Sequence, residues 1–321
     1  MRTDKTGRIV ALYVIVTLLF LALPFLTRHY SVASEMLIFA IFAMGYDILF
    51  GYTGLPSFGH AIFFGTGAYT LALLLIKWKV PLVVAFLGGC LAGTLAALIV
   101  GVLAIRRKGV YFVMITIALC QLCFLIGAKW TSLTGGENGL HGVPRPTLGP
   151  IHLASEIHFY YFVLFVFVVS VLLAVRVVRS PFGRVIRSIQ SNEEGAKSIG
   201  FNTNRFKLLA FLISAFFPSL AGGLYALHLN FVPIETLSLD ISGDVVLMGL
   251  IGGIGTLYGP VFGAMLLVYL KNSLSGITEQ WNLIIGILFV VSILTFRRGI
   301  LRELKEKTFP ARPDGPRRDK S

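Results

Sequence analysis

The chain has 321 residues, of which 56% are hydrophobic and 13% are charged, and its mean hydropathy is +0.82. A soluble domain usually carries about 25% charged residues, so this composition excludes a soluble fold and predicts an all-α polytopic membrane protein. The net charge of +13 comes from basic clusters that alternate with apolar runs. This arrangement excludes a nucleic-acid-binding surface, which would be one basic patch on a soluble fold.

The first apolar run, 9–26, follows a basic start and is followed by Thr27, Arg28 and His29 rather than by a small-residue cleavage site. We therefore expect an uncleaved first span with a cytoplasmic amino terminus. A spanning helix needs about 20 apolar residues. The sequence predicts about eight full spans, at 9–26, 33–50, 58–76, 82–105, 109–127, 158–178, 208–228 and 281–296.

A Gly/Pro-rich break, GYTGLPSFGH at 51–60, interrupts an uncharged apolar region. It is either a tight turn between spans or irregular backbone that lines a cavity, as in transporters with broken helices. We take Ser57, Gly59 and His60 as pathway candidates. For His60, a structural role within the core is the alternative.

Ionisable residues inside the predicted spans are few. Glu35 and Asp47 lie near the ends of their run, so we expect both at the membrane interface. Asp244 opens a later segment and is expected to cap its first helix. These residues form no chain of acids and histidines of the kind that proton-coupled transporters use.

The loop 131–146 reads TSLTGGENGLHGVPRP, and its glycines and prolines exclude a helix. With the amino terminus inside, this loop lies outside, and the basic cluster 106–108 lies inside. The loop is either a solvated connector or a surface that an external partner or substrate touches. Asn138 at its polar tip is a further pathway candidate.

The longest polar interruption, 180–207, is predicted to be a cytoplasmic loop. Ser180 before Pro181 marks a helix start, and Ser191 with Glu194 has capping-box spacing for a second short helix. Gly200 suits the left-handed stop of that helix, while Gly195, Ala196 and Ile199 give it a small apolar face. From the residues alone, this helix either docks into a partner or lies on anionic lipid.

The segment 241–270 is apolar, but GGIGTLYGP at 252–260 breaks it. We predict two short limbs that enter and leave on the outer face, with Gly253 and Gly255 as pathway candidates. The basic tail, 301–321, is then cytoplasmic, and we expect it to be disordered.

Motifs of enzymes are absent from the sequence. It has no phosphate-binding loop, no G-x-S-x-G and no H-E-x-x-H, so we expect neither catalysis nor a cofactor nor a metal site in this chain. If ATP drives its action, another subunit binds the nucleotide.

Five stretches carry a resemblance. Glu194-Gly195-Ala196 with Gly200 is similar to the E-A-A-x-x-x-G signature of ABC importer permeases, although a glycine replaces the middle alanine and the later I-x-L-P part is not matched. Further stretches resemble branched-chain amino acid permeases of the LivM type, and together they cover most of residues 33–300. They are GLPSFGHAIFFGTGAY at 54–69, TGGENGL at 134–140, SPFGR at 180–184 and LIGGIGTLYGPVFG at 250–263.

The resemblance implies one transmembrane permease domain, 1–300, with a coupling loop at 180–207. It implies a non-catalytic, multi-pass subunit of an ABC importer for leucine, isoleucine and valine in the bacterial inner membrane. The implied partners are two cytoplasmic ATPase subunits, a homologous second permease of the LivH type, and a periplasmic or extracellular binding protein. The implied ATPase-coupling residues are Arg184, Glu194, Gly195, Ala196 and Gly200.

Two alternatives stay open. The permeases of urea and short-chain amide importers are similar, and the binding protein sets much of the specificity. A stand-alone secondary transporter or channel would suit the two Gly/Pro breaks equally well. The missing charge relay and the elaborate polar loop count against that second alternative.

Overall fold

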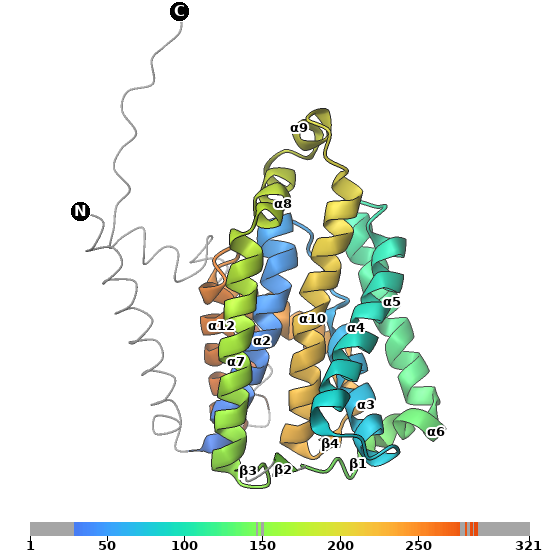
Figure 1. Ribbon diagram of the computed structural model, residues 1–321, viewed down its shortest axis with the longest axis vertical. Coiled ribbons are helices and arrows are strands. Elements are labelled where there is room, and N and C mark those ends of the chain that lie inside the picture. The colour runs from blue at the N-terminus through green and yellow to red at the C-terminus, as the bar shows by residue number, and fades with distance from the viewer. Residues whose placement is uncertain are drawn as a thin grey trace, which may run out of the picture.

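In the computed structural model the chain is a bundle of long helices that run roughly side by side (Figure 1). The structure describes residues 29–145, 147–148, 151–276, 280, 283–284 and 286–287. The predicted span 9–26, nearly all of the predicted span 281–296, and the tail 301–321 lie outside the described residues.

The helical elements in chain order are α2 (Tyr30–Thr53), α3 (His60–Ile76), α4 (Leu82–Ala104), α5 (Val110–Lys129), α6 (Thr131–Thr134), η1 (Gly136–Asn138), α7 (Glu156–Arg179), α8 (Pro181–Ser191), α9 (Glu193–Ser198), α10 (Thr203–Leu229), η2 (Ile234–Leu237), α11 (Leu239–Gly252) and α12 (Tyr258–Ser275). The short strands are β1 (Leu140–His141), β2 (Thr147–Leu148), β3 (Ile151–His152) and β4 (Phe231–Val232). β1 pairs with β4 and β2 with β3, both antiparallel.

Each of the six predicted spans between 33 and 228 is a helix. Among the described residues, α2, α4, α5, α7 and α10 are long and apolar enough to cross a membrane. The helix α3 has only 17 residues, because the chain leaves α2 at Gly54 and runs without helical structure to Gly59 before α3 begins. The total of eight spans stays a prediction, since two of them fall outside the described part of the chain.

The bundle has two different ends (Figure 1). The α9 end carries α8, α9 and the loop 105–109, and the strand end carries α6 and the four strands. Ten of the fifteen Lys and Arg between residues 29 and 276 lie at the α9 end. This is the asymmetry that a cytoplasmic α9 end predicts.

α2 is the central helix and is almost wholly buried. It packs against α7, α10 and α12, while α4, α5 and α7 turn apolar side chains outward, as lipid requires. α3 crosses α10 so closely that a Cβ on Gly67 would overlap the backbone of Ser219. Small residues at such crossings let helices associate in a membrane through backbone contact.

The loop 131–146 is more ordered than its composition predicts. The exclusion of a helix was wrong for its first four residues, which form the single turn α6 before Gly135 adopts a left-handed conformation. Arg145 Nε donates to the carbonyl of Leu227 at 2.7 Å, and its guanidinium lies 4.7 Å from the Phe159 ring centroid. The loop therefore closes the last turn of α10, whose carbonyls have no partner within the helix.

The prediction for 241–270 is confirmed as two limbs around a break. α11 and α12 run antiparallel, with Gly252 against Gly259 and Gly263 against Met248. The capping role expected of Asp244 was wrong, because Ser238 caps α11 and its Oγ accepts from the Ile241 amide at 3.4 Å. Asp244 instead pairs with Lys271 of α12.

Candidate functional site

The helix α8 presents a polar face at the α9 end. Ser180 caps it as predicted, because its Oγ accepts from the Gly183 amide at 3.2 Å. Ile186 and Ile189 are buried toward the bundle, where α8 contacts α2 and α7. Arg184 lies on the exposed side, so its predicted coupling position is accessible to a partner.

The helix α9 is a single compact unit with a cap at each end. The predicted capping box at Ser191 was wrong, since Ser191 is the last residue of α8, and Asn192 Oδ1 accepts from the Gly195 amide at 2.9 Å instead. The predicted stop at Gly200 is confirmed, with φ of 92°. The Phe201 amide donates to the carbonyl of Ala196 at 3.2 Å, which completes a Schellman motif.

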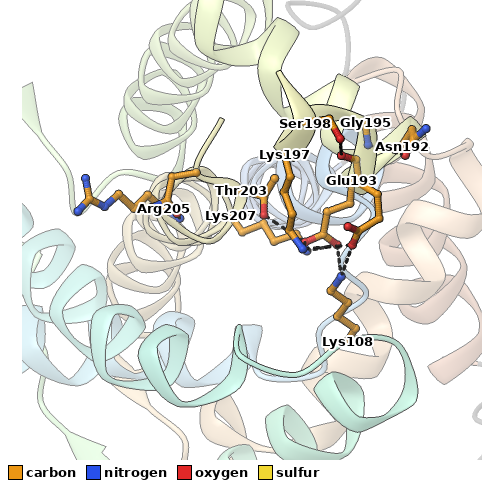
Figure 2. Close-up of polar contacts among 11 residues, drawn as sticks. Lys108, Asn192, Glu193, Gly195, Lys197, Ser198, Thr203, Arg205 and Lys207 are labelled. Atoms are coloured by element: carbon orange, nitrogen blue, oxygen red, sulfur yellow. Dashed lines mark hydrogen bonds and ion pairs between the residues drawn. The ribbon is translucent and has the colours of Figure 1, made fainter. Parts of the chain in front are cut away.

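An ion-pair cluster centred on Glu193 ties α9 to two other elements (Figure 2). Lys207 of α10 and Lys108 of the loop 105–109 place their Nζ atoms 2.8 and 2.9 Å from Glu193 Oε2. Thr203 Oγ1 donates to Glu193 Oε1 at 3.2 Å. The side chains of Lys207 and Glu193 are only 5% and 16% exposed, so water screens this pair weakly.

The two neighbouring carboxylates differ in their surroundings. Burial alone would raise the pKa of Glu193, but the hydrogen bonds and charges of Lys207 and Lys108 outweigh it and lower the pKa to about 2. Glu194 is 76% exposed and pairs with Lys197 at 3.1 Å, which lowers its pKa. Glu193 therefore holds the helix in place, whereas Glu194 lies on the exposed side, where a partner can reach it.

The small apolar face predicted for α9 is divided by the structure. Ala196 is 3% exposed and packs inward, whereas Ile199 is 75% exposed. Phe201 follows at 37% exposure. The apolar surface that α9 offers to a partner is therefore made by Ile199 and Phe201 around the exposed Gly200.

The pathway candidates of the first break are buried within the helix bundle. Ser57 and His60 are both fully buried. Ser57 Oγ accepts from the Gly59 amide at 3.2 Å, and His60 Nε2 lies 2.8 Å from Ser214 Oγ of α10. His60 also stands edge-on against Tyr46 of α2, with ring centroids 5.0 Å apart.

The other pathway candidates occupy two separate places. Asn138 is exposed at the strand end and belongs to η1, away from the buried break. Gly253 and Gly255 lie in the turn between α11 and α12, where Asp47 of α2 binds the backbone. Asp47, for which we expect a place at the membrane interface, is 1% exposed and lies buried among the helices. α2 thus brings the two breaks together, through Tyr46 on one side and Asp47 on the other.

Sequence reasoning missed the residues that hold these parts together, namely Lys108, Lys207 and Asp47. Two of them, Lys207 and Asp47, had a detectable signal. Lys207 belongs to the polar loop but has a strongly apolar continuation after it, which indicates a helix that extends beyond the membrane. Asp47 is an acid in an otherwise uncharged apolar run, and such residues in a membrane protein usually have a partner or a function.

Comparison with known proteins matches the chain to one family of transport permeases. Residues 30–293 match the family model for the branched-chain amino acid transport system / permease component. The chain is 28% identical to the high-affinity branched-chain amino acid transport system permease protein LivM of Salmonella typhimurium, over 87% of this chain and 72% of that protein. It is also 28% identical to LivM of Escherichia coli, over 89% of this chain and 74% of that protein.

A more distant relative carries a different substrate name. The autoinducer 2 import system permease protein LsrC of Yersinia enterocolitica is 26% identical over 61% of this chain and 55% of that protein. No solved structure matches the chain.

Proposed function

Because the chain belongs to the family of permease components of branched-chain amino acid transport systems, we propose that it is the membrane-spanning subunit of a binding-protein-dependent ABC importer for leucine, isoleucine and valine. In this proposal the chain is a non-catalytic, multi-pass protein of the bacterial inner membrane. Two cytoplasmic ATPase subunits bind and hydrolyse ATP, a homologous permease forms the other half of the pathway, and a binding protein delivers the amino acid.

The observation that carries the proposal is the α8–α9 unit. It offers an exposed apolar tip, Ile199 and Phe201, at the basic end of the bundle. It is also fixed to α10 through Glu193 and Lys207. A short helix that is both exposed and firmly attached is suited to receive movement from a partner and to pass it to the membrane helices.

Reconstitution tests the transport activity. The chain, its second permease and the ATPase subunits are placed in liposomes, and uptake of labelled leucine is measured with and without ATP and binding protein. We expect uptake only when both are present. Uptake that persists when ATP or the binding protein is left out contradicts the proposal and supports a stand-alone transporter or channel. Labelled urea in place of leucine tests the short-chain amide alternative.

A pair of substitutions tests the docking surface. Ile199→Arg adds a charge to the exposed tip of α9, and we expect it to abolish copurification of the ATPase subunits and ATP-driven uptake. Trp78→Arg is the matched control, because Trp78 is 71% exposed but lies at the opposite end, after α3. If both substitutions reduce copurification and uptake equally, or if Ile199→Arg reduces neither, the assignment of α9 as the docking element is contradicted.

A further inference from the structure

Asp47 holds the turn between α11 and α12. Its Oδ1 accepts from the Gly255 amide at 2.6 Å, and its Oδ2 accepts from the Leu257 amide at 2.9 Å. The turn 253–257 needs such support, because Gly253, Gly255 and Leu257 all have positive φ, at 98°, 81° and 59°. A non-glycine residue such as Leu257 in this conformation persists only where its surroundings enforce it.

The same end of α2 is hydrogen-bonded to α8. Gln190 Nε2 donates to the carbonyl of Gly51 at 3.0 Å, one turn beyond Asp47. The backbones of Gly51 and Gly255 are so close that a Cβ on Gly51 would lie 2.5 Å from the Gly255 nitrogen. Arg187 of α8 lies 4.7 Å from the ring centroid of Tyr52. α8, the end of α2 and the turn 253–257 therefore form one continuous set of contacts.

A carboxylate is chemically suited to this position. Two backbone N–H donors meet two acceptor oxygens, and charge-assisted hydrogen bonds of this kind are stronger than neutral ones. Burying a charge costs free energy unless donors compensate for it, so the carboxylate is stable only while both donors stay in place. A shift of the turn that separates either donor from Asp47 is therefore strongly opposed.

We propose that Asp47 is a positioning residue that couples α8 to the turn 253–257. Movement of α8 reaches Gly51 through Gln190, and Asp47 then moves the turn as part of α2. This inference rests on the proposed function in one respect, namely that partner ATPases move the α8–α9 unit. The contact path itself is a property of this chain and is testable without partners.

The first experiment uses the full chain alone in lipid nanodiscs and measures hydrogen exchange of the amides in 253–257. We expect Asp47→Ala to accelerate this exchange about tenfold or more, since both charged hydrogen bonds are lost. Gln190→Ala, on another helix, should accelerate this exchange several-fold. The double variant should exchange only slightly faster than Asp47→Ala alone, because the two residues act in one path. Glu35→Gln is the control: Glu35 lies at the other end of α2 and accepts from Asn272 at 3.1 Å. No effect of Gln190→Ala, or full additivity, overturns the coupling.

The second experiment uses the reconstituted transporter and Asp47→Asn, which keeps the shape but offers one acceptor oxygen. We expect leucine uptake per ATP hydrolysed to fall about tenfold, while ATP hydrolysis and the amount of assembled complex stay near wild type. Uptake and hydrolysis that fall in equal proportion, or that do not change, indicate a merely structural role and overturn the proposal. If the wild-type complex takes up no leucine, the proposed function fails, whereas the exchange experiment still decides the coupling.

Discussion

Replacing Glu193 with Gln should loosen α9 while leaving the membrane helices intact. The substitution keeps the size of the side chain and removes its charge. Lys207, only 5% exposed, then loses its carboxylate partner, and Lys108 loses its closest ion pair. Because these two lysines belong to α10 and to the loop 105–109, the variant weakens the attachment of α9 to both.

The magnitude follows from the pKa of Glu193, which interaction with Lys207 and Lys108 lowers from 4.5 to about 2 despite the opposing effect of burial. The lowered pKa means that this stabilisation is complete above about pH 4.5 and is lost as the pH falls toward 2. At pH 7 the difference corresponds to about 3 kcal/mol. Lys108 is 56% exposed, so water screens its part of the interaction and reduces the total to about 1–2 kcal/mol.

Hydrogen exchange at pH 7 measures this loss directly, because the amides of Ala196, Ile199 and Phe201 donate within the α9 unit. A change of about 1–2 kcal/mol predicts exchange about 5- to 30-fold faster in Glu193→Gln. Glu194→Gln is the matched control. It removes the same charge from the next residue in the chain, whose side chain is 76% exposed. We expect it to change exchange by about twofold at most.

Equal acceleration in the two variants would refute the reasoning, because it would mean that burial of Glu193 between Lys207 and Lys108 contributes nothing. The pH dependence gives a second check. After correction for intrinsic exchange rates, protection of α9 in the wild-type chain should be constant between pH 6 and 8. A decrease of protection within that range would contradict the lowered pKa of Glu193.

Further substitutions test the packing of the bundle, the first two sets by thermal unfolding in detergent and the third by proteolysis. Gly67→Ala should lower stability by about 1–3 kcal/mol, since its methyl group overlaps the backbone of α10, whereas Gly243→Ala, with open space around it, should be neutral or slightly stabilising. Lys271→Met should cost about 3 kcal/mol by leaving Asp244 without its ion-pair partner, and adding Asp244→Asn should recover most of that loss. Arg145→Lys should be nearly as damaging as Arg145→Ala to protease resistance of the loop 140–145, because a lysine cannot both bind the α10 carbonyl and stack on the phenylalanine ring in the same way.

The membrane spans could be predicted from sequence because the bilayer imposes both their length and their apolar character. The predicted run 33–50 corresponds to α2, and 158–178 to α7. The largest difference is at α10, which begins at Thr203, five residues before the apolar run. Asn202 caps this extension, since its Oδ1 accepts from the Arg205 amide at 3.2 Å. Composition marks where a helix enters the membrane, whereas the cap marks where it begins.

The candidate site could be predicted only in its local parts. The stop at Gly200 depends on neighbouring residues, so its signal is contained within a few positions. The contact of Asp47 with Gly255 joins residues 208 positions apart, and nothing in either stretch specifies the other. The helix α2 also continues to Thr53, so Asp47 lies within a helix and is buried against its neighbours rather than at a helix end. Long-range pairing is set by how helices pack, and one sequence alone does not specify that packing.

The contacts of the α8–α9 unit divide into two routes. Gln190 leads to Gly51 and, through Asp47, to the turn 253–257. Glu193 leads to Lys207 and therefore to α10, which is packed tightly against α3. If the routes are independent, Gln190→Ala should accelerate exchange in 253–257 and leave α9 protected, whereas Glu193→Gln should do the reverse. Both changes appearing together in either variant would show that α8 and α9 move as one rigid body, and that a partner pressing on α9 displaces both routes at once.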